Sequence, residues 1–227
     1  MAVTPDIRRI GSAHSPLIVI DDFSGEVETI VGQAAAMAPF PAAARGQYPG
    51  TRRIIAPGEP AADYVSTTLK TVAPLIFAEF GVKRFDVHYA SFSMITIDPA
   101  DLLPQQRVPH YDSTHPHYIA ILHYLSASPG GGTAFYRQRA TGIDTVDEAN
   151  VTAFSTVADD VAGDFAGYIG AGNAAFEQIA MVEAVPDRLI IYPGCLLHSG
   201  LIPAGQRLSD DPRQGRLTAN LFIQGQA

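Results

Sequence analysis

The order of local patterns along the chain is the feature that most limits its fold. Residues 25–38 and 60–80 are predicted helices, and the apolar positions of the second recur at helical spacing. From Arg84 onward, aromatic and β-branched runs alternate with turn residues, which is typical of strands. Helices that precede a series of strands predict helices packed on a mostly antiparallel sheet, not a parallel α/β sheet. The pattern alone therefore predicts an α+β fold that is mainly β.

Capping and turn residues place the ends of several elements. Ser24 is expected to cap the first helix, and Pro39 to stop it. Gly81 supplies the end of the second helix, which Pro74 is expected to kink or split. We further expect strands over 7–10, 17–20, 85–97, 118–125, 174–185, 188–192 and 217–223, loops over 39–50 and 98–109, and a helical insertion at about 145–166.

Length and composition limit the class of protein. The 227 residues, 47% of them hydrophobic, suffice for one domain with a full core, so we predict a single domain over 1–227. The net charge of −8 gives no electrostatic footprint for nucleic acid or an anionic membrane, and neither is an expected partner. The single cysteine, Cys195, excludes an internal disulfide and fits a reducing compartment. Because no secretory signal or membrane-length apolar run is evident, we expect a cytoplasmic protein.

Two histidines and an aspartate form the strongest candidate site. His110 and Asp112 lie two residues apart, so in an extended backbone both side chains point to the same face. His198 follows the predicted strand over 188–192 and would lie at the mouth of that strand. Two imidazoles and one carboxylate are the facial triad that binds Fe(II) and leaves coordination positions open. The sequence therefore predicts a metal site formed by His110, Asp112 and His198.

Three other histidines compete for this assignment. His115 and His117 lie close to His110, and a local cluster of this kind would suit zinc or copper as readily as iron. His123 lies in the middle of a predicted strand and is expected to be a core or sheet-face residue. A ligand set drawn from the local cluster therefore stays open as an alternative.

The motifs around the triad, taken in order, resemble those of a known superfamily. After His110-Tyr111-Asp112 come an apolar run over 118–125, a glycine-rich turn over 129–132, the distal His198 and Arg216-Leu217-Thr218. This order resembles the 2-oxoglutarate and Fe(II)-dependent dioxygenases, most closely their prolyl-hydroxylase-like branch. A closer likeness, to a bacterial family of uncharacterised function called DUF6445, is carried by Tyr48-Pro49-Gly50-Thr51-Arg52 and the Gly-Gly-Thr-Ala-Phe turn over 131–135. The resemblance implies a double-stranded β-helix, or jelly roll, with the N-terminal helices packed on its major sheet.

The resemblance also implies a site for 2-oxoglutarate as co-substrate. Arg216 would bind the distal carboxylate of 2-oxoglutarate, since a guanidinium can hold a carboxylate through two hydrogen bonds. Thr218, two residues further along the same strand face, would add a hydroxyl group. Arg207 lies nearer to His198 in the sequence and stays a rival anchor, although it belongs to a Pro/Gly/Ser-rich loop.

Tyr89 is the third residue that the resemblance assigns to the co-substrate, because a tyrosine in the corresponding strand hydrogen-bonds it in prolyl-hydroxylase-like enzymes. Tyr89 shares one strand face with Ser91 and Ser93, and this polar face should line a cavity or meet solvent. Arg52 and Arg53 are interpreted as a solvated edge rather than as contacts to an acidic substrate.

Together these residues imply a non-haem Fe(II)/2-oxoglutarate-dependent oxygenase that hydroxylates its substrate and releases succinate and carbon dioxide. Two other classes stay open. One is a non-catalytic metal- or ligand-binding module on the same scaffold, and the other is a cupin-like isomerase or hydrolase that uses zinc, nickel or manganese. The prime substrate is left open among small metabolites, amino acids, peptides and protein side chains, and the oligomeric state is not indicated.

Overall fold

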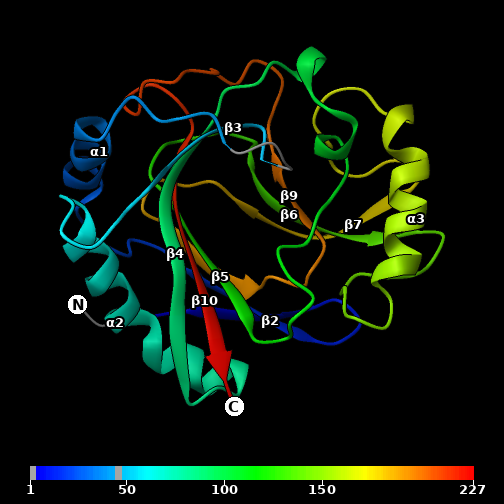
Figure 1. Ribbon diagram of the computed structural model, residues 1–227, viewed down its shortest axis with the longest axis horizontal. Helices are drawn as coiled ribbons and strands as arrows, with labels where there is room; N and C mark the ends of the chain where they lie inside the picture. The colour runs from blue at the N-terminus through cyan, green and yellow to red at the C-terminus, as the bar shows by residue number, and fades with distance from the viewer. Residues whose placement is uncertain (1–3, 44–47) are drawn as a thin grey trace.

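Two antiparallel sheets form the centre of the computed structural model, which describes residues 4–43 and 48–227 (Figure 1). The major sheet has the strand order β1-β2-β8-β5-β10-β4-β3, and the minor sheet has the order β7-β6-β9. The prediction of a mainly β fold with antiparallel pairing is confirmed. The strands are β1 (Asp6–Ile10), β2 (Ser15–Ile20), β3 (Gly50–Ile54), β4 (Arg84–Ile95), β5 (Tyr118–Tyr124), β6 (Gly132–Gln138), β7 (Phe176–Glu183), β8 (Leu189–Pro193), β9 (His198–Leu201) and β10 (Leu217–Gln226).

Alternation along β10 separates two buried layers. Leu217, Ala219 and Leu221 belong to a core cluster that includes the N-terminal helices. Thr218 and Phe222, at intervening positions, point to the opposite face of the sheet, where they line a cavity. Because β10 is an interior strand, between β5 and β4, its second face can present polar side chains to an enclosed site.

Two helices cover the outer face of the major sheet, to the left in Figure 1: α1 (Val27–Ala36) and α2 (Ala62–Phe80). Ile30 of α1 and Ile76 of α2 are buried in the same core cluster as the outward-facing residues of β10. Pro74 lies inside α2 without dividing it, and Gly81 ends the helix in the left-handed conformation, with φ of 67°. The expected packing of the N-terminal helices on the major sheet is therefore confirmed.

The prediction that Ser24 caps α1 was wrong. The helix begins at Val27, and its cap position makes no hydrogen bond through a side chain. The hydroxyl of Ser24 instead donates to the carboxylate of Asp187 at 2.6 Å, and the Ser24 backbone N–H donates to the same carboxylate at 2.9 Å. Ser24 Oγ also accepts from the Glu26 backbone N–H at 3.1 Å, so the serine joins the turn before the helix to a buried acid from a distant part of the chain.

The helical insertion predicted at about 145–166 is shorter than expected. Helix α3 covers Val151–Val161 and is followed by a single 3-10 turn, Ala162–Asp164. Thr145 forms a β-bridge with Leu196, which keeps the start of the predicted helix in an extended conformation. Phe154 and Ala158 of α3 pack against the outer face of the minor sheet, so this helix closes the side opposite α1 and α2.

Three strands were not predicted: β3, β6 and β9. Strand β3, at the edge of the major sheet, pairs with β4. Strand β6 is the centre of the minor sheet, where it pairs with β7 and β9. The predicted loop over 39–50 falls partly outside the described residues, while the predicted loop over 98–109 contains two 3-10 turns, Pro99–Asp101 and Pro104–Gln106. No helix in the described part of the chain is long and apolar enough to cross a membrane.

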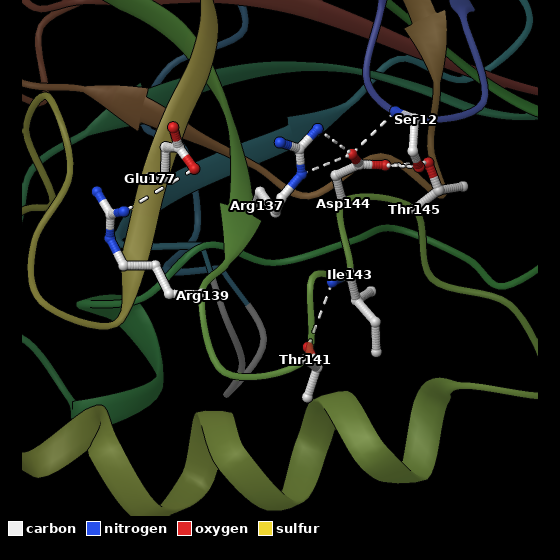
Figure 2. Close-up of polar contacts among 8 residues, drawn as sticks. All are labelled: Ser12, Arg137, Arg139, Thr141, Ile143, Asp144, Thr145 and Glu177. Atoms are coloured by element: carbon white, nitrogen blue, oxygen red, sulfur yellow. Dashed lines mark hydrogen bonds and ion pairs between the residues drawn. The ribbon is translucent and has the colours of Figure 1, made fainter.

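A buried carboxylate ties the N-terminal hairpin to the minor sheet (Figure 2). Asp144 is only 1% exposed, and it accepts hydrogen bonds from the backbone N–H and hydroxyl of Ser12 at 2.9 and 2.8 Å. Arg137 of β6 donates to the same carboxylate at 2.9 Å. The backbone carbonyl of Asp144 accepts from Leu197 N–H at 2.9 Å. This contact anchors the residue that immediately precedes His198.

Candidate metal centre

His110, Asp112 and His198 converge as predicted. Each offers one ligand atom, and these atoms all lie within 4.8 Å of one another. His198 Nε2 lies 3.6 Å from Asp112 Oδ2, and His110 Nε2 lies 4.0 Å from Asp112 Oδ1. The two imidazole ring centres are 4.4 Å apart. The geometry therefore brings two nitrogen ligands and one carboxylate around a single point.

Backbone pairing sets the positions of the two histidines. The N–H of His110 donates to the carbonyl of His198 at 2.9 Å, and the N–H of His198 donates to the carbonyl of His110 at 2.8 Å. This reciprocal exchange makes them a directly opposed pair, so both side chains leave the same face. His198 opens β9, whose pairing with β6 places His198 opposite Phe135. It therefore lies at the start of a strand of its own, whereas the sequence placed it at the mouth of the preceding strand.

Asp112 is positioned by Gly194 and not by a regular strand. The expected extended backbone over 110–112 is an isolated bridge at His110 followed by a bend at Asp112. The N–H of Asp112 donates to the carbonyl of Gly194 at 2.7 Å, and the N–H of Gly194 donates to the backbone carbonyl of Tyr118 at 2.7 Å. A Cβ at position 194 would lie 2.8 Å from the Tyr118 ring and 3.1 Å from Asp112 Cβ. Glycine is therefore required for this close approach.

Hydrogen bonding and burial suit the three side chains to a cation. His198 Nδ1 lies 2.8 Å from the carbonyl of Leu196, which can only accept, so Nδ1 carries the proton and Nε2 presents a lone pair. Oδ2 of Asp112 is buried with no hydrogen-bond partner among the described residues. Burial raises the pKa of Asp112 against the opposing effects of His198 and Arg52, and burial lowers the pKa of His110. A bound cation would satisfy this orphaned oxygen and favour the ionised carboxylate and neutral imidazoles.

The triad opens into a narrow cavity of about 90 Å³ that also contains Arg216 and Thr218. Arg216 is 4% exposed, and its Nη2 donates to the carbonyl of Gly132 at 3.0 Å, while its Nε has no hydrogen-bond partner in the described structure. No carboxylate among the described residues forms an ion pair with it. Because a buried cation without an anion is costly, this arrangement favours an acidic ligand.

The other two residues considered for the co-substrate lie elsewhere. Arg207 is exposed and does not line the cavity, which favours Arg216 as the anchor. Tyr89 lines a wider groove on the other side of His110 and Asp112, and its hydroxyl accepts from Arg52 Nη1 at 3.1 Å. A contact between Tyr89 and the co-substrate stays a prediction. The neighbouring polar face is interior rather than solvated, since Ser91 and Ser93 are both fully buried.

The rival histidines do not join the triad. Within the described residues, the three-ligand cluster consists of His110, Asp112 and His198. His115 is exposed, and its Nδ1 lies 2.9 Å from Nε2 of Gln224. His123 is fully buried on the helix side of the major sheet. Its Nε2 lies 2.9 Å from Oδ1 of Asp187, and its Nδ1 lies 2.9 Å from the hydroxyl of Tyr64. It is the core histidine that its position in the strand predicted.

Arg52 and Tyr48 are site residues whose positions the sequence did not reveal. Both line the narrow cavity, so the interpretation of Arg52 as part of a solvated edge was wrong. The available signal was the Tyr-Pro-Gly-x-Arg segment itself. Its Gly50 packs so closely on β4 that an added Cβ would lie 1.9 Å from the carbonyl of Met94. This contact lets β3 pair with β4, which aligns Arg52 with Ser93 on the cavity side.

Comparisons with known proteins agree with this architecture. A family model described as "Family of unknown function (DUF6445)" matches residues 1–223. No curated protein matches the sequence. Among solved structures, the epimerase SnoN from nogalamycin biosynthesis, described as non-haem and alpha-ketoglutarate dependent, is similar at 12% identity. Its TM-score is 0.57, with 96% of this chain and 79% of that chain covered.

Two further structures share the fold. A Pseudomonas putida prolyl-4-hydroxylase is 13% identical with a TM-score of 0.53, and 95% of each chain is covered. HygX from Streptomyces hygroscopicus, solved with nickel and 2-oxoglutarate bound, is 14% identical with a TM-score of 0.54, and 96% of this chain and 84% of that chain are covered. At these identities the likeness concerns the fold.

Proposed function

The chain belongs to the DUF6445 family, and we propose that it is a non-haem Fe(II)/2-oxoglutarate-dependent oxygenase on a double-stranded β-helix scaffold. The observation that carries the proposal is the convergence of His110, Asp112 and His198 at one end of a cavity that also holds the unpaired Arg216. The structural neighbours support it, because all three share the fold. The descriptions of SnoN and HygX also name alpha-ketoglutarate, which is 2-oxoglutarate.

The three ligands would hold Fe(II) through two imidazole nitrogens and one carboxylate oxygen. This donor set fits Fe(II), since a facial arrangement of three protein ligands leaves positions open for small molecules. The hydrogen bond from His198 Nδ1 to Leu196 keeps Nε2 available, and the contact of Asp112 with Gly194 holds the carboxylate against the imidazoles. The chain thus supplies both the ligands and the contacts that orient them.

Arg216 and Thr218 would bind the distal carboxylate of 2-oxoglutarate. Both line the cavity, and Arg216 keeps one nitrogen without a partner in the described structure. The 90 Å³ of this cavity correspond to roughly six to nine water positions at about 10–15 Å³ each, which is the scale of a small diacid. When bound, Fe(II) and 2-oxoglutarate supply the oxidising chemistry, in which O2 converts the keto acid to succinate and carbon dioxide and oxidises the substrate.

Co-substrate binding is the direct test. Under anaerobic conditions, Fe(II) and 2-oxoglutarate should give a visible charge-transfer band in the native protein and none in His198→Ala. Arg216→Gln should weaken 2-oxoglutarate binding about 10- to 100-fold, as expected for loss of charge-assisted hydrogen bonds. Arg207→Gln is the matched control and should bind like the native protein, because Arg207 is exposed outside the cavity.

Admission of O2 then tests turnover. The native protein should release succinate from 2-oxoglutarate, and His110→Ala should not. Retained succinate release in His110→Ala would refute the assignment of the metal site. A stable iron complex that never consumes 2-oxoglutarate would favour the non-catalytic binding module instead.

A further inference from the structure

A second and wider cavity adjoins the metal ligands. This substrate groove, as we name it, has a volume of about 570 Å³, which lies in the range of small-molecule sites. It shares Tyr48, Arg52, His110 and Asp112 with the narrow cavity, so the two spaces meet at the candidate metal position. The rest of its wall is small, apolar or aromatic and consists of Pro41, Ala42, Ala43, Ile54, Tyr89 and Tyr118.

Arg52 is the cation at the junction of the two spaces. Its guanidinium carbon lies 4.6 Å from the Tyr48 ring centre and 5.8 Å from that of Tyr89. Its Nε donates to Ser93 Oγ at 3.2 Å, and its Nη1 donates to the Tyr89 hydroxyl at 3.1 Å. These acceptors are neutral, and no carboxylate of the described chain lies within ion-pair distance. The aromatic rings and two hydrogen bonds therefore hold the guanidinium in place without neutralising it.

The neighbouring arginine, by comparison, has an acid partner. Arg53 lies next to Arg52 on β3, but strand alternation directs it to the opposite face, where it pairs with Glu59. Arg137, Arg139 and Arg188 also have carboxylate partners. In contrast, Arg52 and Arg216 both line the narrow cavity without one.

A charge count identifies what the substrate groove lacks. A divalent cation and the guanidinium groups of Arg52 and Arg216 carry four positive formal charges, and Asp112 carries one negative charge. The two carboxylates of 2-oxoglutarate balance two of the remaining charges, so one positive charge is left. Since Arg216 would be paired with the distal carboxylate, the unbalanced charge belongs to Arg52, on the wall of the substrate groove. In a half-enclosed space such a charge favours an anion.

We infer that the prime substrate is a small molecule with one carboxylate on an apolar body, held in the substrate groove with its carboxylate on Arg52 and its apolar part against the tyrosine walls. This inference rests on the proposed function, because the charge count includes Fe(II) and 2-oxoglutarate. A guanidinium matches a carboxylate through two parallel hydrogen bonds. The groove is adjacent to His110 and Asp112, so a molecule anchored at Arg52 would be held beside the metal.

A binding experiment tests the inference without turnover. The full chain, loaded with Fe(II) and 2-oxoglutarate without oxygen, is titrated calorimetrically with 3-phenylpropanoate, its neutral analogue 3-phenylpropanamide, and phenyl phosphate. We expect the carboxylate to bind at least tenfold more tightly than the amide and more tightly than the phosphate. Arg52→Gln should weaken carboxylate binding about 10- to 100-fold and leave amide binding unchanged. Arg52→Lys should restore part of the loss, because it keeps the charge.

Arg53→Gln is the matched control, since it removes the adjacent arginine from the opposite face and should leave binding of all three probes unchanged. Equal affinities for carboxylate and amide, or stronger binding of the phosphate, would overturn the inference. So would a loss of 2-oxoglutarate affinity in Arg52→Gln as large as that in Arg216→Gln, because Arg52 would then belong to the co-substrate site.

The same titration separates this inference from the proposed function. If the native protein forms no Fe(II)–2-oxoglutarate complex, the proposed function fails, and the probes are titrated into the metal-free chain. Arg52-dependent carboxylate binding there would still support the substrate groove as an anion site. Its absence there would overturn the inference as well.

Discussion

Replacement of Gly194 by alanine should weaken metal binding through a steric effect transmitted to Asp112. The added Cβ would lie 2.8 Å from the Tyr118 ring and 3.1 Å from Asp112 Cβ. Normal carbon–carbon contacts are about 3.5–4.0 Å, so the Asp112 side chain or the Tyr118 ring must move by about 0.4–1.2 Å. Tyr118 is packed against His88 and Phe222, which leaves the carboxylate as the group that yields more easily.

The expected magnitude follows from the tolerance of metal sites. Ligand distances are held to about 0.2 Å, and disturbing the groups that orient a ligand typically costs about 10- to 100-fold in metal affinity. We therefore expect Gly194→Ala to weaken Fe(II) binding by this factor, or about 1.4–2.8 kcal/mol, measured by anaerobic calorimetry. Position 194 does not have a positive φ, so backbone strain does not contribute.

Gly32→Ala is the control for this experiment. Gly32 lies in α1, where the described part of the chain leaves open space around an added Cβ. It should leave Fe(II) affinity unchanged and raise stability by about 0.5–1 kcal/mol, because alanine is the better helix residue. Native Fe(II) affinity in Gly194→Ala would refute the argument that Gly194 positions Asp112.

Two further predictions concern stability. Asp144→Ala should reduce the free energy of unfolding by about 2–4 kcal/mol in urea titrations, because it removes buried charge-assisted hydrogen bonds to Ser12 and Arg137 (Figure 2). The control, Glu177→Ala, removes only an exposed 3.9 Å ion pair with Arg139 and should reduce it by under about 1 kcal/mol. Equal effects of the two variants would contradict the buried role of Asp144. Burial lowers the pKa of His123 against the opposing hydrogen bond with Asp187, so the unfolded chain binds more protons and stability should fall as the pH drops below about 6.5. The pKa of Asp187 is also lowered, since hydrogen bonds from Ser24, Gly25 and His123 outweigh burial, and this adds a second loss as the pH falls below about 4. Urea midpoints measured from pH 8 to 3 check both steps, and a His123→Gln protein that keeps the first step would contradict the assignment.

Local sequence signals predicted the elements whose side chains alternate over a long run. The final strand, expected over 217–223, is the core of β10, because its apolar residues occur at every second position. The three candidate ligands stood out because their spacing and order carry chemical information, and the structure brings them together. In the first case the signal lies in residues that are close in the sequence. In the second it lies in residue types, histidine above all, for which the chain offers few alternative candidates.

The features that were missed depend on long-range contacts. Strand β9 has four residues and includes Gly200, so it shows no periodicity, and it exists because His198 pairs with His110 and β6. Whether Arg52 or Arg53 lines the cavity depends on which face of the edge strand β3 meets it. Two adjacent arginines point to opposite faces, and the sequence alone does not show which face that is. Ser24 has the chemistry of a helix cap, but the buried Asp187 lies 163 positions away in sequence and could not be anticipated locally.

The reciprocal backbone bonds between His110 and His198 bear on how the candidate centre would take up the proposed metal. Main-chain pairing directs both imidazoles to the same side during folding. Much of the conformational entropy of the two histidines is therefore lost when the chain folds, and less would be lost when a metal ion binds. The metal-free chain would in this respect be preorganised. Metal uptake should then need little rearrangement, and apo and loaded forms should have nearly the same backbone around these two residues.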